Sequence, residues 1–290
     1  MHEIVSRDGR RLEVLTDGPE DGFPLVFHHG TPQGAVPFGV LNRTAADRGL
    51  RVIAYSRPGY GGSTARADAV VADDAQDVAD ILDALGYDEF VTLGWSGGGP
   101  RAIACAAMLP GRCRAAASGA GIAPPDAAGL DLLAGMGPEN VEEFTAAFEG
   151  KAALTAWLDA NSASVFEATA EQIVAAFGEL VPDVDKAALT GELAEHLAAS
   201  FRAAGRQGIT GWLDDDLMLV RPWGFDLSAI EVPVAIWQGT EDLMVPFSHA
   251  QWLADHVRGA SAHLVEGQGH FSLISRMDLV LADLLDLAHS

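Results

Sequence analysis

The sequence is poor in cysteine and has no long apolar run. Cys105 and Cys113 are the only cysteines among 290 residues, so no disulfide framework is expected. Their spacing also lacks the histidines that accompany cysteines in a zinc site. No stretch approaches the roughly 18 consecutive apolar residues that a helix needs to cross a bilayer. These absences argue against a disulfide-stabilised scaffold and against a membrane-spanning protein.

Basic residues are also scarce. The chain has 18 Lys and Arg against 41 Asp and Glu, which gives a formal net charge of -23. Such a surface repels nucleic-acid phosphates and anionic membrane faces. We therefore expect a small-molecule partner and neither nucleic-acid nor membrane binding, and the charge leaves the oligomeric state open. The net charge does not select a substrate, because the field inside one pocket need not follow the sum over the whole protein.

The length and the first residues indicate what kind of protein this is. A chain of 290 residues buries a substantial core, as most enzymes do. Residues 1–11 alternate charged and apolar side chains, without the basic start and apolar run of a signal peptide. We therefore expect a globular protein of the cytoplasm.

Short apolar segments rich in β-branched residues alternate with longer segments of helical periodicity. This alternation is typical of the α/β class, in which helices flank a mostly parallel central sheet. The predicted strands are residues 12–15, 25–28, 52–55, 90–93, 115–118, 234–237 and 262–265. The predicted helices of the same unit are residues 73–85, 97–109 and 278–287.

The middle third of the chain breaks the alternation. Residues 124–222 show repeated helical periodicity and no convincing strand, so we expect an inserted, all-helical cap. The α/β core is then formed by residues 1–123 and 223–290. Within the insert, Asp183 is placed to cap one long helical segment that reaches Ala204.

The strongest chemical signal is the run GWSGGG at residues 94–99. It is a G-x-S-x-G element that directly follows a predicted strand and directly precedes a predicted helix. A sharp strand-to-helix turn strains the central residue and brings the residues on either side of it together, so Gly94 and Gly98 meet a steric demand. Ser96 is then a nucleophile whose hydroxyl projects above the sheet. The alternative, a glycine-rich turn with an incidental serine, explains the strand and helix context less well.

Two backbone N–H groups are expected to form an oxyanion hole. Gly97 begins the helix after Ser96, where N–H groups have no partner inside the helix. The loop HGTP at residues 29–32 follows the strand 25–28, and the Thr31 N–H of that loop supplies the second donor.

A serine nucleophile needs a histidine base and an acid that orients the histidine. Of the nine histidines, His270 follows the last predicted strand and precedes the last predicted helix, on a loop that contains glycine. Asp242 follows the strand 234–237 and stands between the serine and the histidine in chain order. Glu241 and Asp126 are the alternatives for the acid.

The adjacent histidines His28 and His29 raise the question of a metal. Successive strand residues point to opposite faces of a sheet, and no carboxylate or cysteine lies near them in the sequence. We therefore expect no metal site. Since side chains supply the whole triad chemistry, no cofactor is expected either.

The insert is expected to cover the pocket and to contribute apolar and polar side chains to it. The substrate-binding residues that we expect are Trp95, Trp157 and Trp212. The insert also carries the acidic residues Glu142, Glu143 and Glu167, which a peptidase would need for recognising an amine, although solvated helix faces explain them more simply.

Taken together, these loops resemble the alpha/beta-hydrolase superfamily, in the capped serine-hydrolase branch that includes esterases, proline iminopeptidases and haloperoxidases. The likeness covers roughly residues 5–121 and 223–287, and SRPGYGGS at residues 56–63 looks like the family's arginine-proline-glycine turn. Haloalkane dehalogenases and epoxide hydrolases of this fold use an aspartate nucleophile. This chain has Ser96 instead, so both of these activities are disfavoured. Proline iminopeptidases usually have tryptophan and glycine after the nucleophile, where this chain has Gly97 and Gly98.

The residues and the resemblance together predict a serine hydrolase. It would cleave a small ester, or a related acyl substrate, through an acyl-enzyme on Ser96. Three alternatives stay open: a proline iminopeptidase-like aminopeptidase, a cofactor-free perhydrolase or carbon-carbon hydrolase, and a ligand-binding protein on the same fold.

Overall fold

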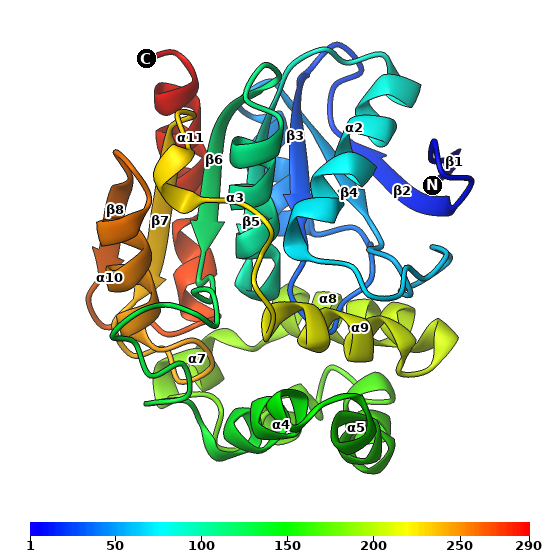
Figure 1. The fold of residues 1–290 in the computed structure, drawn as a ribbon, viewed down its shortest axis with the longest axis vertical. Coiled ribbons are helices and arrows are strands. Elements are labelled where there is room, and N and C mark those ends of the chain that lie inside the picture. The colour runs from blue at the N-terminus through cyan, green and yellow to red at the C-terminus, as the bar shows by residue number, and fades with distance from the viewer.

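Eight strands form one central sheet in the computed structural model, which describes all of residues 1–290 (Figure 1). The strands lie in the order β1-β2-β4-β3-β5-β6-β7-β8; β2 pairs antiparallel with β1 and β4, and the other neighbours pair parallel. They are β1 (His2–Val5), β2 (Arg11–Asp17), β3 (Phe23–His28), β4 (Leu50–Tyr55), β5 (Phe90–Trp95), β6 (Cys113–Gly119), β7 (Val234–Gly239) and β8 (Ser261–Val265). The predicted α/β class with a mostly parallel sheet is confirmed.

Each of the seven predicted strands lies inside an observed strand, and the eighth, β1, was not predicted. β1 is an edge strand of four residues in which Ile4 alone is buried. One buried residue gives no alternating pattern, so the sequence carries no strand signal there.

Helices cover both faces of the sheet, because successive strand residues point to opposite sides. Leu25 and Phe27 pack in a core cluster with the helices α1 and α11, whereas Val26, between them, packs in a second cluster with α2, α3 and α10. These helices are α1 (Gly39–Ala46), α2 (Asp74–Leu85), α3 (Gly99–Met108), α10 (Phe247–His256) and α11 (Met277–Ala288).

Between β6 and β7 the chain forms helices and no strand. They are α4 (Pro138–Glu149), α5 (Lys151–Phe166), α6 (Ile173–Ala176), α7 (Asp183–Ala188), α8 (Gly191–Ala204) and α9 (Thr210–Leu219). In Figure 1 this helical insert lies below the carboxyl ends of the parallel strands, with α8 and α9 next to the sheet and α4 and α5 farther from it. Ligands of open α/β sheets bind at this edge.

The prediction of one helical segment from Asp183 to Ala204 is wrong. α7 ends at Ala188, α8 begins at Gly191, and Gly191 has a φ of +51°, which a continuous right-handed helix does not allow. Asp183 is the first residue of α7 and does not cap it with its side chain. Leu189 is buried at the break, so packing of this side chain replaces helix continuity.

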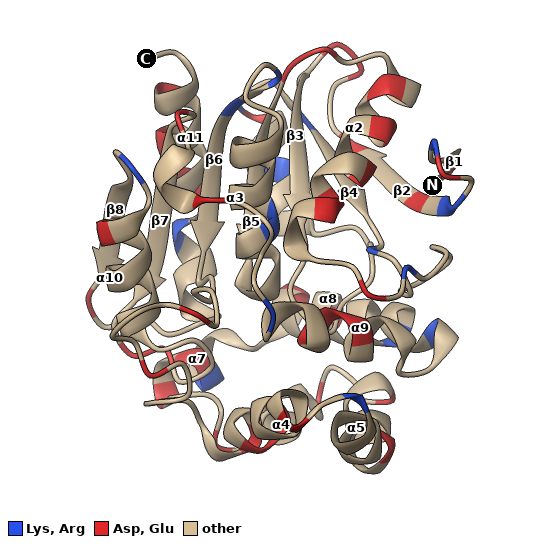
Figure 2. Cartoon of the chain, in the orientation of Figure 1, with Lys and Arg blue, Asp and Glu red and all other residues tan.

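Acidic side chains are spread over the helices of the core and of the insert (Figure 2). Several of them pair with arginines, for example Glu192 of α8 with Arg43 of α1. No helix combines the length and the apolar composition that a bilayer crossing requires.

Candidate active site

Ser96 lies at the sharp turn between β5 and α3. Its φ is +55°, in the left-handed region that residues other than glycine rarely adopt. A Cβ atom on Gly94 would overlap the carbonyl oxygen of Gly98, and a Cβ atom on Gly98 would overlap the carbonyl oxygen of His28. Both glycines are therefore required by packing. Backbone strain of this kind is maintained mainly at functional positions, and here it holds Ser96 at the edge of the sheet.

His270 and Asp242 form a buried pair at the same edge. His270 Nδ1 lies 2.8 Å from Asp242 Oδ2, and the two residues are 2% and 3% exposed. The other oxygen of Asp242 accepts the backbone N–H groups of Met244 and Val245, each at 2.8 Å, and Gln238 Nε2 donates to Oδ2 at 2.8 Å. Four donors thus fix the carboxylate, and the carboxylate fixes Nδ1 as the protonated nitrogen, which leaves Nε2 as the basic one.

The pKa of His270 is raised from its ordinary value. Burial alone lowers it, but the charge of Asp242, its hydrogen bond to the imidazole and the charge of Asp185 outweigh burial. A protonated imidazole is therefore stabilised at this position, as a general base requires once it has accepted a proton.

Neither alternative acid contacts the imidazole. Glu241 and Asp126 are both exposed, and no hydrogen bond joins either carboxylate to His270. Asp242 differs from Glu241 because the turn after β7 directs Asp242 inward, where backbone N–H groups bind it.

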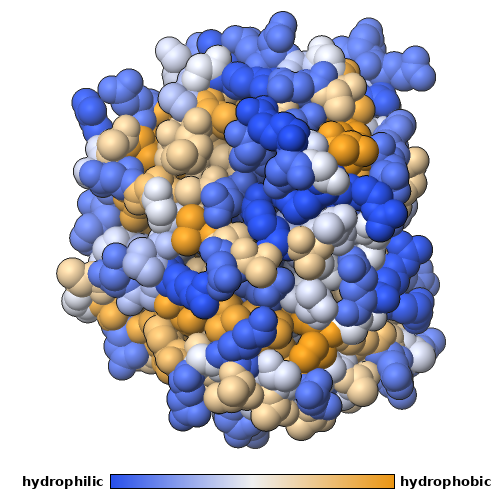
Figure 3. Space-filling model, turned by 45° about the vertical axis from the view of Figure 1, so that its right-hand side comes forward, coloured by the Kyte–Doolittle hydropathy of each residue, from blue (hydrophilic) through white to orange (hydrophobic).

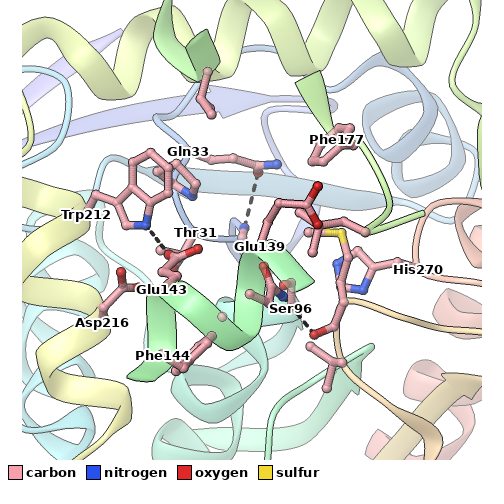
Figure 4. A pocket seen from close by; sticks show the side chains of 18 of the residues that line it. Thr31, Gln33, Ser96, Glu139, Glu143, Phe144, Phe177, Trp212, Asp216 and His270 are labelled. Atoms are coloured by element: carbon pink, nitrogen blue, oxygen red, sulfur yellow. Dashed lines mark hydrogen bonds between the residues drawn. The ribbon is translucent and has the colours of Figure 1, made fainter. Parts of the chain in front are cut away.

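Ser96 and His270 line the same cavity (Figure 4). The cavity has a volume of about 160 Å³ and lies between the sheet edge and the insert. The Ser96 hydroxyl forms no hydrogen bond to the imidazole, a contact that in serine enzymes often tightens only when substrate binds. In Figure 3 apolar side chains reach the surface in the lower part of the face shown and in smaller patches above it.

Thr31 and Gly97 lie against each other beside Ser96. A Cβ atom on Gly97 would overlap the Thr31 hydroxyl and would lie 3.4 Å from the Thr31 backbone nitrogen. A Cβ atom on Gly30 would lie 3.4 Å from Ser96 Cβ. The expected oxyanion residues and the expected nucleophile are thus neighbours, although the loop after β3 and the turn after β5 are far apart in the sequence.

A buried cluster of ion pairs supports the loop of residues 29–32. Arg57 donates to the carbonyl oxygens of His29 and Gly30 and to Asp215, and Arg101 donates to the Gly97 carbonyl oxygen and to Asp215. Burial raises the pKa of Asp215, but the charges of Arg101 and Arg57 outweigh it and hold the pKa well below its ordinary value. The sequence analysis did not identify this cluster.

One signal in the sequence could have identified part of it. Arg57 belongs to the arginine-proline-glycine turn, and in the structure this residue binds the carbonyl oxygen of Gly30 and the carboxylate of Asp215. Asp215 is the middle residue of three consecutive aspartates in α9; it is buried, as is Asp216, and only the fold shows which of them binds the arginines.

Aromatic and acidic side chains of the insert complete the cavity. The core contributes Gly30, Thr31, Trp95, Ser96, Gly97 and His270, and the insert contributes Glu139, Glu143, Phe144, Trp157, Trp212 and Asp216. The three expected substrate-binding tryptophans all line it. Of the three glutamates considered for amine recognition, Glu143 lines the cavity, whereas Glu142 and Glu167 are exposed and do not.

Glu143 of α4 and Asp216 of α9 form a pair of buried carboxyl groups in the cavity wall (Figure 4). Burial raises the pKa of both, and the neighbouring charge of Glu143 raises that of Asp216 further. The pair therefore holds a proton more tightly than isolated carboxyl groups do. Trp212 Nε1 donates to Glu143 Oε1 at 2.6 Å.

His28 and His29 are both buried and make no metal-like arrangement. His28 Nδ1 lies 3.3 Å from the Tyr55 hydroxyl, and His29 Nδ1 lies 2.8 Å from the Gly30 carbonyl oxygen. Burial and the charge of Arg57 lower the pKa of both imidazoles. Nowhere in the chain do three or more histidine, cysteine, aspartate or glutamate side chains converge on a point that a metal ion would occupy.

Comparison with known proteins gives the family. The family model described as alpha/beta hydrolase fold matches residues 24–276. A non-heme chloroperoxidase of Streptomyces lividans is 28% identical over 293 residues, which cover 100% of each chain. A bifunctional esterase/perhydrolase of Acinetobacter calcoaceticus is 25% identical over 256 residues, which cover 85% of this chain and 84% of that protein.

Solved structures with the same fold include hydrolases of bacteria. A hydrolase from Pseudomonas aeruginosa superposes with a TM-score of 0.69 at 21% identity, over 98% of this chain and 97% of that one. An esterase from Exiguobacterium antarcticum superposes with a TM-score of 0.68 at 18% identity, over 99% of each chain. These similarities extend over the insert as well as the sheet, and at this identity they establish the fold alone.

Proposed function

The chain belongs to the alpha/beta-hydrolase family, and from this premise we propose that it is a serine hydrolase that cleaves a small ester through an acyl-enzyme on Ser96. The observation that carries the proposal is a single cavity lined by Ser96, at a strained turn, and by His270, in hydrogen bond with Asp242. A nucleophile, a base held in one tautomer and a buried orienting acid are the groups that acyl transfer requires.

The proposed reaction has two steps. Ser96 Oγ attacks the ester carbonyl carbon while His270 Nε2 accepts its proton, and the Thr31 and Gly97 N–H groups bind the oxyanion. His270 then protonates the departing alcohol, which leaves an acyl group on Ser96. Water attacks the acyl group while His270 accepts a proton from the water; the bond between the acyl carbon and Ser96 Oγ then breaks, His270 returns the proton to Oγ, and the carboxylic acid departs. Each step uses groups of the protein and water.

A fluorophosphonate probe tests the nucleophile. The wild-type protein should be labelled, and Ser96→Ala should abolish labelling, whereas Ser164→Ala should not, because Ser164 lines the cavity on the insert side, away from the turn. Removal of the base by His270→Ala should lower ester turnover by several orders of magnitude. Labelling that persists in Ser96→Ala would refute the assignment, and a protein that only binds ligands would release no product from an activated ester.

The acidic lining of the cavity supports a narrower substrate class, an ester that carries a protonated amine. Glu139, Glu143 and Asp216 line the cavity, and no lysine or arginine does. Glu139 Oε2 and Asp216 Oδ2 are both buried without a hydrogen-bond partner. Buried acceptors without donors are costly, and an ammonium group would satisfy them.

Matched substrates test this class. We expect the nitrophenyl ester of 6-aminohexanoate to be cleaved with a higher kcat/KM than that of hexanoate. Glu143→Gln should reduce this preference about 10- to 100-fold, the usual value of a charge-assisted hydrogen bond. Glu142→Gln removes the same charge from the exposed side of α4 and should leave the preference unchanged. Proline nitroanilide belongs in the same panel, because faster cleavage of this amide would favour an aminopeptidase.

Perhydrolysis is a second candidate, supported by the similarity to the bifunctional esterase/perhydrolase of Acinetobacter calcoaceticus. In this reaction hydrogen peroxide replaces water, attacks the acyl group on Ser96 and leaves as a peracid. The test is the ratio of peracid to carboxylic acid formed from an acetate ester in dilute hydrogen peroxide. A ratio well above the molar ratio of peroxide to water would favour perhydrolysis, and a ratio at or below it would contradict it.

A further inference from the structure

The loop that carries His270 is bound by a carboxylate of the insert. Asp185, in the short helix α7, is completely buried. Its side chain points away from its own helix to the loop between β8 and the 3₁₀ helix η5 (Ser272–Arg276). This carboxylate therefore joins the insert to the catalytic loop of the core.

Three consecutive backbone N–H groups donate to this one carboxylate. The His270 N–H donates to Oδ2 at 2.7 Å, and the N–H groups of Phe271 and Ser272 donate to Oδ1 at 3.0 and 2.8 Å. A Cβ atom on Gly269 would lie 2.6 Å from the carboxylate carbon of Asp185, so a residue with a side chain at this position would displace the carboxylate. The Asp185 carboxylate thus contacts four successive residues, 269–272.

These N–H groups need an acceptor from elsewhere in the chain. They lie at the beginning of η5, where backbone N–H groups have no partner inside the helix. No side chain of the loop itself caps this helix. Hydrogen bonds to an ionised acceptor are stronger than those between neutral groups, so Asp185 holds the loop more firmly than a local serine or threonine cap would.

A second contact between the insert and this loop also holds the backbone near His270. Phe177 of the insert packs on Phe271, with ring centroids 4.8 Å apart. Asp242 binds the imidazole of His270 from the core, while Asp185 and Phe177 hold its backbone from the insert. Asp242 alone leaves the backbone of the loop free to shift, because it contacts only the side chain.

We propose that Asp185 is a positioning residue, and that its carboxylate holds residues 270–272 so that the His270 imidazole stays aligned between Asp242 and Ser96. The proposal rests on the role of His270 as the base of the proposed hydrolase. It makes the insert a part of the catalytic apparatus as well as a wall of the cavity.

The charged and titratable groups around the imidazole make the proposal testable by pH. Asp242 faces it from the loop after β7, Asp185 from α7, and Glu139 from α4 across the cavity. The charge of Asp185 contributes to the raised pKa of His270. Neutralising Asp185 should therefore lower the pKa of His270 and shift the acid limb of the kcat/KM profile to lower pH.

The experiment compares Asp185→Asn with Asp183→Asn, which removes the same charge from the exposed start of the same helix. Asp185→Asn presents an amide group where backbone N–H groups need acceptors, and we expect kcat to fall about 10- to 100-fold with little change in KM. Asp183→Asn should behave as the wild type. Gly269→Ala is a second variant that displaces the loop and leaves the charge of Asp185 in place, and it should also lower kcat.

An NMR titration of the His270 imidazole in the Ser96→Ala protein gives a reading that needs no turnover. A lowered pKa in the folded Asp185→Asn protein, with the pKa of the Asp183→Asn protein unchanged, supports the proposal even if the hydrolase assignment fails. An unchanged pKa of His270 and an unchanged kcat in a folded Asp185→Asn protein would overturn it, even if the protein melts at a lower temperature.

Discussion

Two buried carboxyl sites lie on opposite sides of the cavity, Asp242 behind His270 and the pair of Glu143 and Asp216 in the wall of the insert, and they differ in how many donors they receive. At the core side, Asp242 accepts three hydrogen bonds besides the contact with His270. At the insert side, Glu143 and Asp216 receive one donor from Trp212 and otherwise face each other. Both sites are removed from solvent, so burial alone does not distinguish them.

The difference shows how the supply of donors separates two buried carboxyl sites. Asp242 has backbone and amide donors on both of its oxygens, which hold it in place beside the imidazole. Glu143 and Asp216 have few donors, so burial raises the pKa of both and acceptor capacity is left for a ligand. In the proposed function, the first site serves catalysis and the second serves recognition.

The largest test of this contrast is Asp242→Asn. The amide donates where the carboxylate accepts, so it favours the wrong imidazole tautomer and no longer stabilises the imidazolium. We expect kcat/KM for a nitrophenyl ester to fall on the order of 10³- to 10⁴-fold near neutral pH. Steady-state kinetics with the purified variant, checked for folding by circular dichroism, measures the effect.

Glu241→Gln is the matched control for this variant. It removes one negative charge at the adjacent, exposed position and should change kcat/KM less than about threefold. If Asp242→Asn lost no more activity than Glu241→Gln, the donor-rich site would not be the catalytic one.

The sequence predicts the core side of the cavity well because its residues follow from local rules. The glycines around Ser96 answer a steric demand of one turn, and Asp242 and His270 follow strands whose apolar runs are easy to identify. Parallel strands bring their carboxyl ends to one edge, so local predictions there are enough to place three distant residues together.

The insert side could not be predicted in the same way. Asp215 and Asp216 are neighbours in one acidic run, yet the pKa of Asp215 is lowered by ion pairs and that of Asp216 is raised by burial, because α9 turns them towards different partners. In the sequence, Asp185 cannot be distinguished from a solvated acidic residue at the start of a helix. Only the tertiary structure shows that the loop of His270 packs against it. Which face of an insert helix is buried depends on tertiary packing, and no periodicity in these short helices encodes it.

A second test concerns stability against pH. The pKa of Asp216 is raised in the folded protein, so the folded state keeps a proton that the unfolded chain releases near its ordinary pKa of 3.8. Stability must therefore fall as the pH rises from about 4 through the raised pKa, since the folded state binds more protons over that interval. Asp216→Asn replaces the protonated acid by a neutral donor and removes this dependence.

The difference in melting temperature between Asp216→Asn and the wild type should increase by about 2–4 °C from pH 5 to pH 8. A shift of this size corresponds to roughly 1 kcal/mol of stability in a protein of this length. Glu142→Gln, on the exposed side of α4, should show no such dependence. If the melting temperatures of the two variants and the wild type changed with pH in the same way, the raised pKa of Asp216 would be contradicted, and the two carboxyl sites would not differ in this respect.

The smallest effect is expected at Asp215, another buried carboxylate, which resembles Asp242 in its supply of donors. It accepts from Arg57, Arg101 and Tyr60 as well as from the Thr31 hydroxyl, which donates at 2.7 Å. Thr31→Val removes one donor of several and keeps the backbone N–H that the oxyanion requires, so kcat/KM should fall less than about tenfold. Thr44→Val, in α1, is the control for the loss of a hydroxyl. If kcat/KM of Thr31→Val fell a hundredfold or more, a carboxylate with many donors would depend on each of them. The number of donors would then not explain the contrast between the two sides of the cavity.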